Sequence, residues 1–248
     1  MYSPNEIPVI EASIYYYDDI YSQETSFEVL SILKKYGFFP PYKLCAGGLT
    51  KNRFITVNKD EAEKLFVRSY CEKDVMNLGM SSMKGKSRDF WKVNWIYTFY
   101  KNSELAIEPK IKPWNILSIS LTYKYLQNND NYINFVSCFK ELIPCLKSFY
   151  ANIDDVSNYI FLMNKADEAC FAPGYIQQIF WGNFFGAELC EKYGIIEIGD
   201  IPCQNKEKIY DGLFVGLTDN VLDFKSSECE KNRGIMRKYL KIKKALLG

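Results

Sequence analysis

The sequence predicts an α+β protein, in which a mostly antiparallel sheet is covered by helices packed on one face. Two segments, Trp91–Phe99 and Leu117–Tyr123, alternate apolar and polar residues, as antiparallel strands covered on one side do. Tyr132–Tyr150 carries apolar residues at steps of three and four, which is typical of an amphipathic helix. Because no repeat or low-complexity linker interrupts the chain, we expect one domain over residues 1–248, with a split near residues 165–172 as the fallback.

The first elements are a strand and a helix. Val9–Tyr17 alternates and predicts a half-buried strand. Ser22–Tyr36 predicts an amphipathic helix, and Gly37 is suited to end it. Phe54–Val57 is a candidate short strand, and Lys59–Tyr70 is the next expected helix.

The two alternating segments follow as the clearest strands, and the residues between them are expected to form a long loop. The helix Tyr132–Tyr150 contains Pro144, which is able to kink it. Tyr159–Met163 and Leu213–Leu217 are further predicted strands.

Pro173–Gly194 is the most informative segment, and its spacing predicts a helix that is apolar nearly all round. Pro173 precedes the start and Gly194 is well placed to end it. Such a helix lies in a core or against another protein, so we expect Trp181 and Phe184 to be structural residues.

Together with the tail Gly212–Leu247, this segment resembles the immunity protein 52 family, chiefly over residues 173–247. The resemblance is carried by one short motif, which consists of Trp181, Gly182, Asn183, Phe184 and Gly186. It implies a small bacterial α+β antidote, encoded beside a polymorphic toxin, that binds and neutralises this cognate toxin. In that family the toxin is often a restriction-endonuclease-like nuclease, and the antidote needs no catalytic residues.

Composition excludes several kinds of enzyme. The chain contains no histidine, which excludes Ser-His-Asp and Cys-His nucleophile systems and removes the commonest transition-metal ligand. Its eight cysteines lack metal-ligand or redox spacing. We therefore predict no metal, no cofactor and no enzymatic activity.

Two alternatives remain open. One is an enzyme of unrecognised type that works through Asp, Glu, Lys or Cys, for which the acidic pairs Asp154–Asp155 and Asp167–Glu168 are candidates. The other is a partner-binding domain outside toxin biology. A deep pocket with converging carboxylates favours the enzyme, whereas a neighbouring toxin gene favours the immunity protein.

Charge and hydropathy limit the partners. The formal net charge is +1, from 31 basic and 30 acidic residues, which gives no overall electrostatic case for direct nucleic-acid binding. No segment approaches the roughly 18 apolar residues of a membrane span. The N-terminal residues lack a secretory signal pattern, so we expect a cytoplasmic protein that has no contact with membranes.

The densest mixture of aromatic and acidic residues lies between Tyr15 and Glu24. Tyrosine supplies contact area and carboxylates steer a basic partner, so this segment is the candidate toxin-binding surface. Its candidate contact residues are Tyr17, Asp18, Asp19, Tyr21 and Glu24. The alternative is a solvated strand end that leads into a helix, where Glu24 favours the positive N-terminus.

Overall fold

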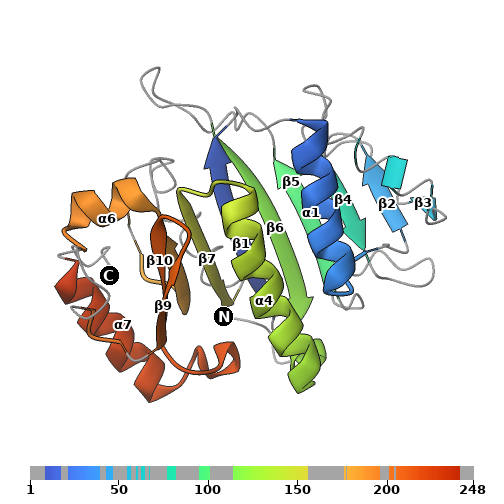
Figure 1. Ribbon diagram of the computed structural model, residues 1–248. Helices are drawn as coiled ribbons and strands as arrows, with labels where there is room; N and C mark the ends of the chain where they lie inside the picture. The colour runs from blue at the N-terminus through green and yellow to red at the C-terminus, as the bar shows by residue number, and fades with distance from the viewer. Residues whose placement is uncertain are drawn as a thin grey trace.

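The computed structural model describes residues 9–17, 22–39, 43–46, 55–56, 60, 63–64, 67, 77–81, 95–100, 114–155, 176, 178–195, 201–203 and 205–240. Within these ranges the strands form one antiparallel sheet in the order β3-β2-β4-β5-β6-β1-β7-β8-β10-β9 (Figure 1). The strands are β1 Val9–Tyr17, β2 Lys43–Ala46, β3 Ile55–Thr56, β4 Asn77–Ser81, β5 Trp95–Tyr100, β6 Trp114–Thr122, β7 Tyr150–Asp155, β8 Gly182–Phe185, β9 Asn205–Ile209 and β10 Gly212–Gly216.

The described helices are α1 Gln23–Lys35, α3 Tyr123–Leu126, α4 Asn129–Cys145, α6 Ala187–Tyr193 and α7 Ser227–Tyr239, with a short 3-10 helix η5 at Val221–Asp223. Figure 1 shows α1 and α4 side by side across one face of the sheet, and α6 and α7 at its β10–β9 end. The predicted α+β class is confirmed. None of the helices in the described part of the chain has the length and apolarity needed to cross a membrane.

The central strand β1 explains why the sheet holds together. It pairs with β6 along its whole length and with β7 on its other side. Ile10, Ala12, Ile14 and Tyr16 alternate along it and are at most 1% exposed. The prediction of a half-buried strand is wrong, because Val9, Ser13 and Tyr15 on the other face are at most 3% exposed. These residues join one continuous apolar core that also includes residues of α1, α4, β8, β10 and α7.

The local signals at the two ends of α1 act as the sequence predicts. The Ser22 hydroxyl accepts a hydrogen bond from the Thr25 backbone N–H and caps α1, and Gly37 follows the helix with a φ of 80°. Asn128 caps α4 in the same way, accepting from two backbone N–H groups. Pro144 lies in the last turn of α4, where it introduces no mid-helix break.

The prediction of a helix as far as Tyr150 is wrong. α4 ends at Cys145, Lys147 has a positive φ of 46°, and Tyr150 begins β7. Leu146 and Phe149 continue the helical spacing of apolar residues, yet they belong to the turn that reverses the chain. Apolar residues at helical spacing can therefore belong to a buried turn, and the spacing alone does not distinguish such a turn from a longer helix.

The prediction of one helix over Pro173–Gly194 is also wrong. Residues 182–185 form β8, and among the described residues of this segment the helix is Ala187–Tyr193, which Gly194 ends with a φ of 67°. Because β8 is buried on both faces, its consecutive residues Phe184 and Phe185 are both apolar, and in the sequence this run looks like part of a helix that is apolar all round. The strands β2, β4, β7 and β9 were not predicted. The predicted strand Tyr159–Met163 lies outside the described residues.

Candidate partner-binding surface

The predicted toxin-binding residues are described only in part. Tyr17 ends β1 and is half-buried, and Glu24 is exposed in the first turn of α1. Asp18, Asp19 and Tyr21 lie outside the described residues. The structure therefore describes the two ends of the segment, residues 15–17 and 22–24, and the interface role of all five residues remains a prediction.

Tyr17 is fixed by contacts with two distant segments. Its ring stacks on Phe149, with centroids 4.5 Å apart and planes at 25°. Its hydroxyl donates a long hydrogen bond of 3.4 Å to Glu188 Oε2 in the first turn of α6. Burial and the charge of Glu188 raise the pKa of Tyr17 to about 12, so the phenol keeps its proton at neutral pH.

Backbone hydrogen bonds hold these segments together. The Phe149 N–H donates to Tyr15 O at 3.2 Å, and the Gly186 N–H donates to Phe149 O at 3.0 Å. A Cβ on Gly186 would lie 2.8 Å from Phe149 O, so the close approach requires glycine. These contacts join the end of β1, the turn after α4 and the start of α6.

The β9–β10 hairpin adds two residues that the sequence reasoning missed. Tyr210 and Asp211 form its two-residue tip, between the paired residues Ile209 and Gly212. Tyr210 is 56% exposed and has a φ of 53°. The dipeptide Asp211-Gly212 is a hairpin signal that was available in the sequence. Pairing of Leu213 with Phe185 brings this tip to the end of the sheet where α6 begins.

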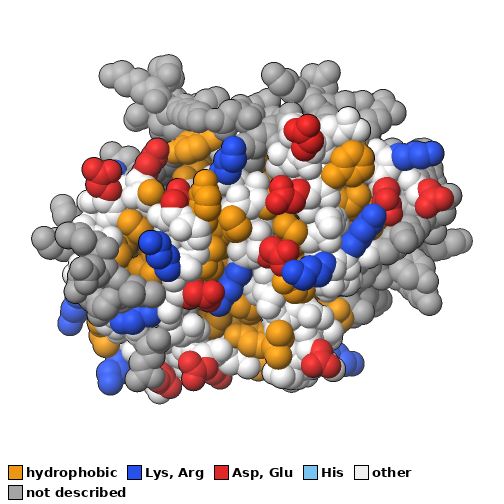
Figure 2. Space-filling model, in the orientation of Figure 1, with side chains coloured by type: hydrophobic (Ala, Val, Ile, Leu, Met, Phe, Trp, Pro, Cys, Tyr) orange, Lys and Arg blue, Asp and Glu red, His pale blue; other side chains and the backbone are white. Residues whose placement is uncertain are grey.

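Two exposed carboxylates lie at this end of the sheet. Glu188 and Asp211 are both exposed, and the pKa of Asp211 is raised, first by burial and then by the charge of Glu188. Figure 2 shows acidic side chains on the end of the molecule where α6 lies, beside hydrophobic ones. This end of the sheet therefore combines aromatic rings with carboxylates.

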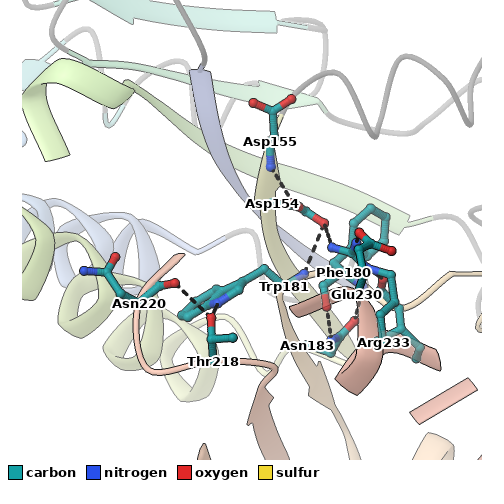
Figure 3. A network of polar contacts seen from close by, with 10 residues as sticks. Asp154, Asp155, Phe180, Trp181, Asn183, Thr218, Asn220, Glu230 and Arg233 are labelled. Carbon is teal, nitrogen blue, oxygen red and sulfur yellow. Dashed lines mark hydrogen bonds and ion pairs between the residues drawn. The ribbon is translucent and has the colours of Figure 1, made fainter. Parts of the chain in front are cut away.

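The family-motif residues lie beneath the surface and are structural in their contacts. Trp181, Gly182, Asn183 and Phe184 are buried, with Trp181 only 1% exposed. The Trp181 indole N–H donates to Thr218 Oγ1 at 2.7 Å, and this hydroxyl donates to Asn220 O at 3.0 Å (Figure 3). The indole thereby ties the start of β8 to the turn that follows β10.

Asn183 shapes the chain that leads into β8. Its side-chain amide donates to Phe180 O at 2.9 Å, and its Oδ1 accepts from the Phe180 N–H at 3.0 Å. An asparagine that pairs with nearby backbone in this way favours a turn over a continuing helix. A Cβ on Gly182 would meet the ring of Phe214 at 3.2 Å, so this position favours glycine for packing.

A buried ion pair joins the last described helix to the sheet. Asp154 on β7 is 0% exposed and Arg233 on α7 is 4% exposed, and their side chains meet at 3.2 Å (Figure 3). Arg233 Nε also donates to Ile179 O at 2.9 Å, and its guanidinium pairs with the exposed Glu230. The Asp154 carboxylate accepts further hydrogen bonds from the Trp181 and Asp155 backbone N–H groups.

This arrangement bears on the acidic pairs considered as catalytic candidates. Asp154 and Asp155 are consecutive residues of a strand, so their side chains leave opposite faces of the sheet, and Figure 3 shows them directed apart. Asp154 contacts Arg233 and two backbone donors, as a structural carboxylate does. Asp167 and Glu168 lie outside the described residues.

The cysteines and carboxylates show no metal geometry in the described ranges. Within them, no group of three or more His, Cys, Asp or Glu side chains is placed to hold a metal ion. Five cysteines whose side chains the structure describes are free thiols: Cys138, Cys145, Cys190, Cys203 and Cys229. Burial raises the pKa of Cys190, Cys203 and Cys229 to about 11, which keeps these thiols protonated and poorly nucleophilic.

Comparison with known proteins identifies the fold and not the family. No family model matches the sequence, and no curated protein matches it. Among solved structures, the chain is similar to the "Pseudomonas aeruginosa T6SS protein PA0821", with a TM-score of 0.66 and 12% sequence identity. The match covers 96% of this chain and 74% of that chain. At this identity the likeness shows a shared fold, and the immunity protein 52 resemblance remains a prediction.

Proposed function

We propose that this chain is an immunity protein, which binds one cognate toxin and neutralises it by occupying a surface the toxin needs. The observation that carries the proposal is the shared fold with a protein named for the T6SS, a bacterial secretion system, over nearly the whole chain. The motif from Trp181 to Gly186 adds the family resemblance. In this proposal the chain acts by binding alone, without catalysis, metal or cofactor, in the cytoplasm.

The chemistry of the proposed interface is acidic and aromatic. Tyr17 is held rigidly by Phe149 and Glu188, so its ring is presented with little loss of freedom on binding. Carboxylates beside it attract a basic protein and speed the encounter. A toxin that itself binds nucleic acid has such a basic surface, which supports a nuclease as the cognate partner.

The test begins with the toxin encoded beside this gene. Cells that express the toxin should survive when this chain is co-expressed, and the purified proteins should form a stable complex. Failure of the chain to bind or protect against the neighbouring toxin would contradict the proposal.

A charge reversal then tests the predicted segment. Asp18→Lys combined with Asp19→Lys should slow association with the toxin at low salt, and the effect should shrink at high salt because screening weakens steering. Its matched control is Asp219→Lys with Glu228→Lys, two exposed positions in the turn after β10 and the first turn of α7. An unchanged association rate in the first variant would remove this segment from the interface.

A further inference from the structure

We draw no further inference here: the strongest candidate, the apolar surface patch on helix α4 around the half-exposed Ile133 and the partly buried Val136, is an unpartnered helix face, and nothing in the part of the chain that the structure describes shows what covers it.

Discussion

Replacing Arg233 by methionine tests the physical account of the buried network. Methionine keeps much of the side-chain volume and removes the charge, which leaves the Asp154 carboxylate at 0% exposure without its guanidinium partner. Breaking a buried ion pair by removing one partner costs about 3–5 kcal/mol, chiefly because the remaining charge stays buried. The hydrogen bond from Arg233 Nε to Ile179 O is also lost, and the range of about 3–5 kcal/mol includes the cost of losing it.

The expected effect is large enough to measure without ambiguity. Proteins of this size unfold with a free energy of about 5–15 kcal/mol, so the substitution removes a substantial fraction of the stability. At about 2–4 °C for each kcal/mol, the melting temperature should fall by roughly 6–20 °C. Urea unfolding followed by tryptophan fluorescence gives the free energy, and calorimetry gives the melting temperature.

Two further variants isolate the cause. Glu230→Gln changes the exposed partner of the same guanidinium and should cost about 0.5 kcal/mol or less. Adding Asp154→Asn to Arg233→Met should recover part of the loss, because the neutral amide no longer buries an unpaired charge. A loss below about 1 kcal/mol in Arg233→Met, or no recovery in the double variant, would refute the reasoning.

Three other outcomes follow from the packing and the titrating groups. Trp181→Ala should cost about 3–5 kcal/mol of unfolding free energy, because the indole is 1% exposed and bonded to Thr218; a fully stable variant that has lost only partner binding would contradict its structural role. Gly212→Ala should cost about 1–3 kcal/mol of unfolding free energy, because the added Cβ would lie 2.2 Å from Phe185 O. Gly234→Ala, in the open interior of α7, should instead stabilise the chain by about 0.5–1 kcal/mol. Urea unfolding measures both, and equal effects of the two substitutions would contradict the packing argument. Burial raises the pKa of Glu11 above 4.5, so its contribution to stability is present at low pH and lost as pH rises through the folded-state pKa. Glu11→Gln should therefore gain in melting temperature relative to the unmodified chain as the pH rises above 4.5, and a difference that stays constant with pH would show that Glu11 is not the titrating group.

Part of the candidate site was predictable because its signal is local. The acidic and tyrosine-rich segment is continuous in sequence, and Tyr17 and Glu24 follow directly from it. Glu188, Tyr210 and Asp211 were not predicted as site residues, since their meeting depends on the pairing of β10 with β8 and on the contact between Tyr17 and α6. No spacing along the chain contains that information.

The sequence by itself determined the α+β class, the central strand Val9–Tyr17 and the helix that Ser22 begins and Gly37 ends, because alternation and caps act over a few neighbouring residues. It did not determine whether residues 173–194 form a helix or include a strand. There the apolar pattern suits a buried helix and a strand covered on both faces equally well, and only the neighbours β7 and β10 decided for the strand β8. The ion pair between Asp154 and Arg233 is likewise a tertiary feature. It joins residues 79 positions apart, and only the packing of α7 against the sheet brings the two buried charges together.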